Sequence, residues 1–426
     1  MPDLPPISLD LECEVERLPN GLFAAAVRHP GVPIVTLDVT YDVGSRVEAP
    51  GRTGLAHLFE HLMFEGSENV PKGDHFRLVA EAGGVTNGTT SEDRTNYFET
   101  LPVESLDLAL YLEADRMRAL ALSEHALSAQ REAVKEEKRL RIDNQPYAAS
   151  FEAVDALAYD GFAYRHPVIG SMEDLDASSI GDAREFYRRY YAPGNALLCL
   201  AGDVEPADAF SRVERFFGPV PARETPQPFR VEEPAPSGPR RGSVADPHAA
   251  LPALHVNHKA PERRHPDLFA LAYAEKILGG GESATLWRRL VKDEEKALSL
   301  SVSVDERRGP SLVRVFSIAR PGVPLSVLEN EIEAALLRLA ADGPTEAEME
   351  RARRMLAAEL IRGTQTTQSI AFLLTEYGLY DGDPSLWRTD VALLLALDRA
   401  DVRDACARTF VSSRRSVVEV LPEPPR

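Results

Sequence analysis

The chain has 426 residues, of which 44% are hydrophobic and 27% are charged, and it carries a formal net charge of −19. At roughly 150 residues per domain, this length favours two or three domains with sizeable cores. Acidic side chains outnumber basic ones by 67 to 48. This excess disfavours nucleic acid or an anionic membrane as a partner, because both require a basic protein surface.

Cysteines and apolar segments bear on the compartment. Three widely separated cysteines, Cys13, Cys199 and Cys406, argue against a disulfide framework and favour a reducing compartment. The first residues contain no apolar core of signal-peptide length, and no run of about 18 apolar residues occurs. We therefore expect a cytoplasmic protein, or a periplasmic or exported one if a signal peptide has been removed.

In chain order, the first half predicts strands, then helices around a strand pair, then a final strand. The predicted strands are 22–27, 32–41, two within 83–102, and 196–201, and the predicted helices are 54–66, 74–82, 103–120 and 124–143.

The second half repeats this plan after a segment rich in proline and charge. It predicts strands at 253–257, 298–304 and 311–319, helices at 267–278, 324–341 and 345–362, and a last strand-like run, SVVEVLPEP. We predict two related α+β domains, each a mostly antiparallel sheet with helices on one face. Their bounds are 1–220 and 244–426, with an extended linker at 221–243.

The pentad His57-Leu58-Phe59-Glu60-His61 is the sharpest chemical signal. On a helix, residues four apart face the same side, so both imidazoles can reach one ion. Zinc commonly takes two histidines and one carboxylate, and it leaves a position for water. Glu60 lies on nearly the same face and can act as a general base on that water. The pattern predicts a zinc site in the H-x-x-E-H order, against the plainer alternative of two unrelated histidines on a partly buried helix.

A third ligand is needed, and the charged helix at 130–141 offers Glu132, Glu136 and Glu137. Helix geometry alone does not choose among them. Most residues of such a run form a solvated helix face.

Three segments in this order, GLAHLFEHLMFEGSENVPKGD, GGVTNGTTSEDRTNYFETLP and QREAVKEEKR, resemble the pitrilysin/insulinase family of zinc peptidases. The resemblance covers nearly the whole chain, strongly in the first half and loosely in the second. It implies that a glutamate about 76 residues after the second histidine is the third ligand, which selects Glu137. The family also has an orienting glutamate seven residues before this ligand. Here that position is Gln130, which can hydrogen-bond but adds no charge, so we assign it no catalytic role.

The resemblance further implies that the run from Gly83 to Thr90 is an edge strand to which a substrate peptide adds as an extra strand. Its candidate substrate-binding residues are Gly84, Asn87 and Thr89. A plain glycine-rich hairpin is the alternative.

Family enzymes carry an arginine and, seven residues later, a tyrosine that binds the substrate carbonyl with it. The matching segment, GGGESATLWRRLVKDEEKALSLSV, contains no tyrosine, and the tyrosine position falls on or near Leu300. The resemblance therefore implies a zinc-bearing chain, with one Zn²⁺, whose homologous partner supplies arginine and tyrosine. A heterodimer is expected and a homodimer is the second choice.

Three functions remain to be compared. The first is a zinc endopeptidase that cleaves peptides or unfolded polypeptides inside a closed chamber. The second is a non-catalytic scaffold subunit of the same fold, and the third is a peptide-binding module that uses the edge strand without cleavage. The combination of His57, Glu60, His61 and Glu137 favours the endopeptidase, because a scaffold needs none of them together.

Overall fold

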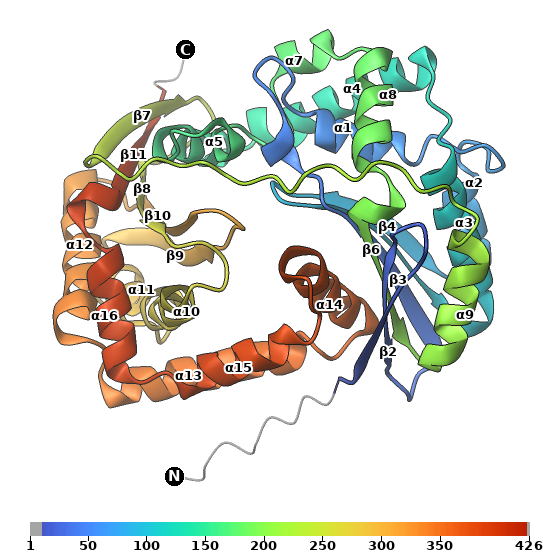
Figure 1. Ribbon diagram of the computed structural model, residues 1–426. Helices are drawn as coiled ribbons and strands as arrows, with labels where there is room; N and C mark the ends of the chain where they lie inside the picture. Colours follow the sequence, from blue (N-terminus) through green and yellow to red (C-terminus); the bar gives the residue numbers. More distant parts are fainter. Residues whose placement is uncertain (1–10, 424–426) are drawn as a thin grey trace.

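Two β-sheets, one from each half of the chain, organise the computed structural model (Figure 1). The structure describes residues 11–423, so the outermost residues of both predicted domains, 1–10 and 424–426, lie outside the described residues. No helix among residues 11–423 is long and apolar enough to cross a membrane.

The first sheet has the strand order β1-β2-β6-β3-β5-β4. Its strands are β1 (Cys13–Arg17), β2 (Phe23–Arg28), β3 (Ile34–Tyr41), β4 (Val85–Thr90), β5 (Thr95–Pro102) and β6 (Ala196–Gly202). Only β2 and β6 pair in parallel among these described strands. The glycine-rich run forms β4, and this strand lies at the edge of the sheet.

The second sheet has the order β7-β11-β8-β10-β9. Its strands are β7 (Arg240–Asp246), β8 (Ala253–Ala260), β9 (Ala297–Asp305), β10 (Ser311–Ala319) and β11 (Arg415–Pro422). The pair β7 and β11 is parallel, and the other pairs are antiparallel. This sheet therefore repeats the pairing of the first sheet without a counterpart of β1, as the prediction of two related α+β halves requires.

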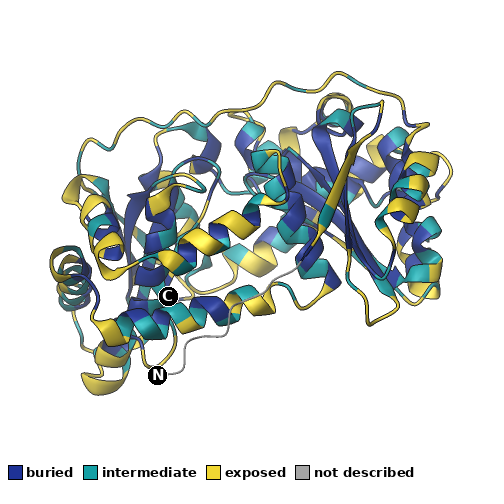
Figure 2. Ribbon diagram, turned by 60° about the horizontal axis from the view of Figure 1, so that its bottom comes forward, coloured by how far each residue is buried: buried dark blue, intermediate teal, exposed yellow. Residues whose placement is uncertain are grey.

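The predicted linker ends too late. Residues 240–243 form the start of β7, and the extended segment without helix or strand covers 221–239. Every residue of that segment is exposed or partly exposed (Figure 2). Strand β7 was not predicted because its sequence, RRGSVAD, is polar apart from Val244 and Ala245, and only its last residue is buried, so it lacks the apolar alternation of a half-buried strand.

Helices cover one face of each sheet. The first half contributes α1 (Leu55–Leu62), α2 (Asp74–Glu81), α3 (Leu106–Arg118), α4 (Glu124–Lys138), α5 (Ala148–Ala158), α6 (Phe162–Arg165), α7 (Met172–Ala177), α8 (Ile180–Tyr190) and α9 (Pro206–Phe217). The second half contributes α10 (Pro266–Gly279), α11 (Thr285–Trp287), α12 (Leu325–Asp342), α13 (Glu346–Arg362), α14 (Thr367–Asp381), α15 (Leu386–Ala396) and α16 (Arg399–Thr409). Each half has its own large hydrophobic core between its helices and its sheet.

Each half also supplies one helix to the opposite sheet (Figure 1). Helix α14 packs Ile370 and Leu374 against Leu197 and Cys199 of β6. Helix α5 packs against β7, β8 and β11 of the second sheet, and Val154 and Ala158 share a core cluster there with β10 and β11. The exchange covers part of the second face of each sheet and ties the two halves together, while the edge strands β4 and β9 keep exposed residues.

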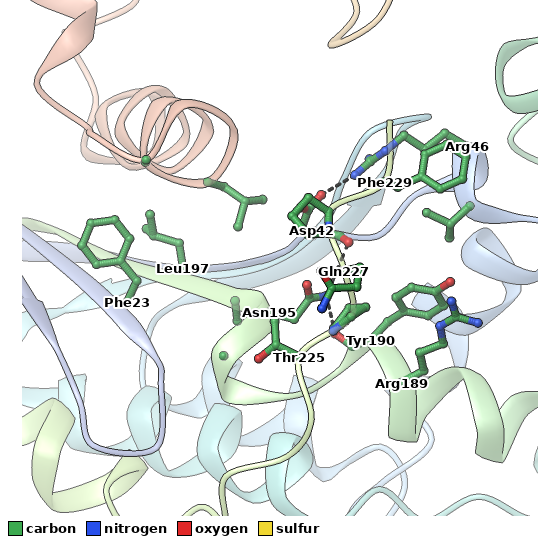
Figure 3. A pocket seen from close by; sticks show the side chains of 18 of the residues that line it. Phe23, Asp42, Arg46, Arg189, Tyr190, Asn195, Leu197, Thr225, Gln227 and Phe229 are labelled. Atoms are coloured by element: carbon green, nitrogen blue, oxygen red, sulfur yellow. Dashed lines mark hydrogen bonds and ion pairs between the residues drawn. The ribbon is translucent and has the colours of Figure 1, made fainter. Parts of the chain in front are cut away.

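The linker also lies over a cavity of about 250 Å³ between the first half and α14 (Figure 3). Thr225 and Phe229 of the linker line it together with Arg46, Tyr190 and Asn195. None of the candidate site residues lines this cavity, and we assign it no catalytic role.

Candidate metal centre

Helix α1 presents its polar side chains on the face opposite its apolar one. Leu55, Leu58, Phe59 and Leu62 are buried in the first core. His57, Glu60 and His61 are partly exposed. The helix begins where both carboxylate oxygens of Glu48 accept hydrogen bonds, one from the backbone N–H of Gly54 at 2.9 Å and the other from that of Ala56 at 2.7 Å. A carboxylate at this end stabilises the helix through its dipole.

Helix α4 brings Glu137 to the two histidines. Oε2 of Glu137 lies 3.4 Å from Nε2 of His61 and 3.7 Å from Nε2 of His57. The other carboxylate oxygen, Oε1, lies 2.9 Å from a guanidinium nitrogen of Arg141, which leaves Oε2 for the histidines. The alternative ligands Glu132 and Glu136 are exposed and pair with Lys135 and Arg139 instead.

The three ligand atoms fit a zinc ion. They all lie within 4.8 Å of one another. With ligand bonds of roughly 2.0–2.2 Å in a tetrahedral site, neighbouring ligand atoms are about 3.3–3.6 Å apart. The two histidine–carboxylate distances are close to this spacing, and two imidazoles with one carboxylate form a donor set that zinc commonly takes.

Charge and tautomer suit metal binding as well. Burial, with a further contribution from neighbouring His61, lowers the pKa of His57 to about 4, so His57 is neutral near pH 7 and keeps a lone pair for a metal. Nδ1 of His61 lies 3.2 Å from Oε1 of Gln130. Gln130, to which the sequence assigned no catalytic role, therefore contacts a candidate ligand and can orient its ring.

Glu60 lies between α1 and the edge strand. The hydroxyl of Thr90 in β4 donates a hydrogen bond to Oε2 of Glu60. Burial raises the pKa of Glu60, and the Thr90 hydrogen bond opposes this shift. Gly88 passes close to the same side chain, because a Cβ atom there would lie 3.1 Å from Cγ of Glu60. Glu60 is therefore held as a partly desolvated carboxylate beside the histidines, as a general base requires.

The candidate substrate-binding residues lie in or next to β4. Gly84 immediately precedes the strand and packs tightly on β5, since a Cβ atom there would lie 2.7 Å from Cβ of Leu101. Asn87 is exposed, and its side-chain oxygen accepts from the backbone N–H of Gly88. The hydroxyl of Thr89 is occupied by Asn96 and Arg94, and its backbone carbonyl also accepts from Arg94 at 3.2 Å. Thr89 therefore already has partners within the strand pair.

A second group of metal-ligating residues is fully buried behind β4. His75, Glu99 and Glu113 also bring ligand atoms within 4.8 Å of one another. However, the guanidinium of Arg116 donates to both oxygens of Glu113 and lies 3.7 Å from Glu99. The positively charged Arg116 side chain already pairs with these carboxylates, so we interpret the group as a structural ion-pair network.

In the second half, the position at which family enzymes carry the carbonyl-binding tyrosine falls on or near Leu300. Leu300 in β9 is 7% exposed and belongs to the second core. Arg288 and Arg289 lie on an irregular helical turn, where they pair with Asp293 and with Glu294. These residues form no carbonyl-binding pair.

Sequence reasoning missed Glu65, Lys72, Thr90 and Arg141, which surround the candidate ligands. A signal existed for one of them. Arg141 follows Glu137 by four residues and pairs with it, the spacing that brings helical side chains together.

The chain is similar to known proteins along most of its length. A family profile described as "Insulinase (Peptidase family M16)" matches residues 24–171, and one described as "Peptidase M16 inactive domain" matches residues 179–356. "Zinc protease PqqE" of Helicobacter pylori is 31% identical over 369 residues, which cover 85% of this chain and 83% of that protein.

Two further relatives extend the comparison. The protein named "Probable mitochondrial-processing peptidase subunit beta" of Schizosaccharomyces pombe is 24% identical over 373 residues, covering 84% of this chain and 80% of that one. The crystal structure of a protease from Helicobacter pylori matches with a TM-score of 0.92 at 29% identity, covering 97% of this chain and all of the other. The family profiles and the identity to a zinc protease along most of its length confirm the resemblance, and the chain belongs to the insulinase family of peptidases, family M16.

Proposed function

We propose that this chain is the metal-bearing subunit of a zinc-dependent endopeptidase that cleaves peptides or unfolded polypeptides. One observation carries the proposal: the ligand atoms of His57, His61 and Glu137 lie within 4.8 Å of one another, on the same side as a partly buried carboxylate, Glu60. Relatives named as zinc proteases support the choice of metal.

In this proposal His57, His61 and Glu137 hold the ion, which supplies Lewis-acid chemistry to a water molecule and to the scissile carbonyl. Glu60 takes a proton from the attacking water and then returns it to the leaving amine. Thr90 keeps the Glu60 carboxylate turned towards the ligands by donating to its Oε2 atom.

The substrate is proposed to add to β4 as an extra strand. On its inner side β4 pairs with β5, and it is the last strand in the order of the first sheet. Backbone N–H and C=O groups of an edge strand can pair with an extended peptide, whatever its sequence. Because Gly88 of β4 lies next to Glu60, a peptide bound there passes the candidate metal centre.

A homologous partner chain is proposed to complete the site. The support is the absence of a tyrosine from residues 279–302 and the burial of Leu300 in the second core. A chain that carries the arginine and tyrosine would close the chamber and bind the substrate carbonyl, with a homodimer as the second choice. Equal peptidase activity of the isolated chain and of the mixture with such a partner would argue against this assembly.

The cytoplasmic location is likewise a prediction, which cell fractionation tests.

The central test compares wild type with the Glu60→Gln variant, each loaded with one equivalent of zinc and assayed together with the partner chain under conditions in which wild type cleaves a peptide. Loss of a general base lowers the rate by about 10²–10⁴-fold, so E60Q should lose peptidase activity by this factor and keep its zinc. The Glu136→Gln variant is the matched control, because Glu136 is exposed and pairs with Arg139 on the same helix as Glu137. Equal cleavage by wild type and E60Q would refute the proposal.

Zinc analysis of the freshly purified chain and peptide binding by wild type and E60Q separate the alternative functions. The description of the second profile as an inactive domain favours a scaffold as the second candidate. A scaffold subunit would bind no stoichiometric zinc when freshly purified. A peptide-binding module would bind peptides equally well as wild type and as E60Q, and neither protein would cleave them.

A further inference from the structure

A chain of hydrogen bonds leads from His61 towards the protein surface. After the contact of 3.2 Å between His61 and Gln130, the amide nitrogen of Gln130 donates to Oε1 of Glu65 at 2.6 Å. Oε2 of Glu65 accepts from Nζ of Lys72 at 2.7 Å. The side chain of Glu65 is 5% exposed, whereas that of Lys72 is 58% exposed. The chain therefore ends in a buried carboxylate held by a surface lysine.

The chemistry of these groups allows one arrangement only. An ionised carboxylate accepts hydrogen bonds and donates none, so Glu65 pairs with the amide nitrogen of Gln130 and repels its amide oxygen. The oxygen of Gln130 is thereby turned towards His61. Because an amide oxygen only accepts, a neutral His61 carries its proton on Nδ1. Its lone pair then lies on Nε2, the atom 3.4 Å from Oε2 of Glu137.

We propose that Glu65 is a positioning residue of the candidate metal centre, which fixes the amide of Gln130 and, through it, the tautomer and ring orientation of His61. Gln130 itself adds no charge, whereas Glu65, the hydrogen-bond partner of Gln130, carries a carboxylate. The role of this hydrogen-bonded chain in zinc binding rests on the proposed function.

His57 provides an internal contrast. Its Nδ1 atom is buried and has no hydrogen-bond partner among residues 11–423. Its ring packs edge-on against His61, with ring centroids 4.9 Å apart. Of the two candidate histidine ligands, His61 alone is oriented by a hydrogen bond within the described part of the chain, so the effect of Glu65 acts through this ligand.

The test measures the zinc affinity of the full chain by competition with a chelator of known affinity. Removal of a residue that orients a metal ligand typically costs about 10–100-fold in affinity, and we expect this loss for Glu65→Ala. Glu65→Gln keeps an acceptor oxygen for Gln130 and should lose less. In the double variant E65A/Q130E, a carboxylate accepts directly from His61, and affinity should return to within a few-fold of wild type. Glu136→Ala, an exposed glutamate on α4, is the control and should bind as wild type does.

A second readout reports geometry instead of affinity. The visible absorption spectrum of the Co²⁺-substituted protein should change in E65A and recover in E65A/Q130E. Thermal melts check that each variant folds. If E65A does not fold, Glu65→Leu, which also lacks an acceptor for Gln130, replaces it in the test. Wild-type affinity in a folded E65A, or no recovery in the double variant, would overturn the proposal.

A failure of the proposed function can be distinguished from a failure of the role proposed for Glu65. If wild type itself binds no zinc, that function is wrong, but the histidine nitrogen resonances of the metal-free protein still decide about Glu65. The Nδ1–H tautomer of His61 in wild type and its loss in E65A would support the positioning role. The same tautomer population in both proteins would contradict it.

Discussion

A Cβ atom on Gly88 would lie 3.1 Å from Cγ of Glu60. The edge strand β4 therefore passes so close to the candidate base that a residue without a side chain is needed there. The other neighbour is the ring of Tyr97, whose Cδ1 atom would lie 3.1 Å from the same Cβ atom. Glycine in a strand often marks such a close approach, and here the approach links the candidate substrate strand to the chemistry.

We expect Gly88→Ala to displace Glu60. The ring of Tyr97 is fully buried and its hydroxyl is hydrogen-bonded to that of Tyr191, so Glu60 is the neighbour that moves. Small misplacements of a catalytic group are costly, and we expect kcat for a peptide substrate to fall about tenfold while the zinc content stays constant. The control is Gly181→Ala in α8, where the nearest atom would be 3.5 Å away. A kcat equal to that of wild type would mean that Glu60 is not held by this contact.

Removal of the Thr90 hydroxyl should shift the pH profile. The hydrogen bond to Oε2 of Glu60 stabilises the ionised carboxylate and opposes the rise of its pKa caused by burial. In Thr90→Val the pKa of Glu60 rises further. A base must be unprotonated to act, so activity is lost as pH falls through this pKa, and the acidic limb of kcat/KM moves to higher pH. The comparison is the pH–rate profile of T90V against wild type and against Thr364→Val, a threonine at the end of α13. Superimposed profiles of T90V and wild type would contradict the expectation.

The local features of the site could be predicted because each has a short sequence period. His57 and His61 are four residues apart on an apolar-faced helix, and the alternating run 85–90 became β4. The choice of Glu137 over Glu132 and Glu136 needed the family resemblance, because all three lie on one helix. Tertiary packing decides between them: Val134 of α4 is buried in the first core, and Glu137, one turn later, faces α1.

Contacts between residues far apart in the chain could not be predicted from the sequence. An apolar helix face indicates that the helix is buried, but it does not say against which sheet, so the packing of α14 on β6 and of α5 on the second sheet could not be predicted. The link between Gln130 and Glu65 joins residues 65 positions apart. Such a contact depends on how α4 packs against α1, and no periodicity encodes it.

Gly378→Ala tests the packing of α14 on the first sheet. A Cβ atom on Gly378 would lie 2.2 Å from Cδ1 of Leu197, a fully buried residue of β6. Overpacking of this kind costs about 1–3 kcal/mol, so the free energy of unfolding should fall, although Gly→Ala inside an unhindered helix stabilises. The double variant G378A/L197A should lose less than the sum of the single variants, because the smaller side chain makes room. Strict additivity in urea denaturation would show that the two residues do not interfere.

Acid should destabilise the second half through His258 on β8. Burial, with Arg415 as the second cause, lowers the pKa of His258 from 6.5 to about 3, and its ring packs against Phe410. Between these two pH values the unfolded chain binds a proton that the folded chain does not. The stability that depends on neutral His258 is therefore complete above pH 6.5 and is lost as pH falls towards 3.

The variant His258→Gln lacks this titration. Wild type should lose up to about 1.4 kcal/mol more stability per pH unit than H258Q within this window, so any stability advantage of wild type at pH 7 should shrink at pH 6, 5 and 4. Urea denaturation at these pH values measures the difference. The matched control is His248→Gln, because His248 is exposed, and its difference from wild type should stay constant. A difference between H258Q and wild type that does not vary with pH would mean that His258 is protonated as readily in the folded chain as in the unfolded one.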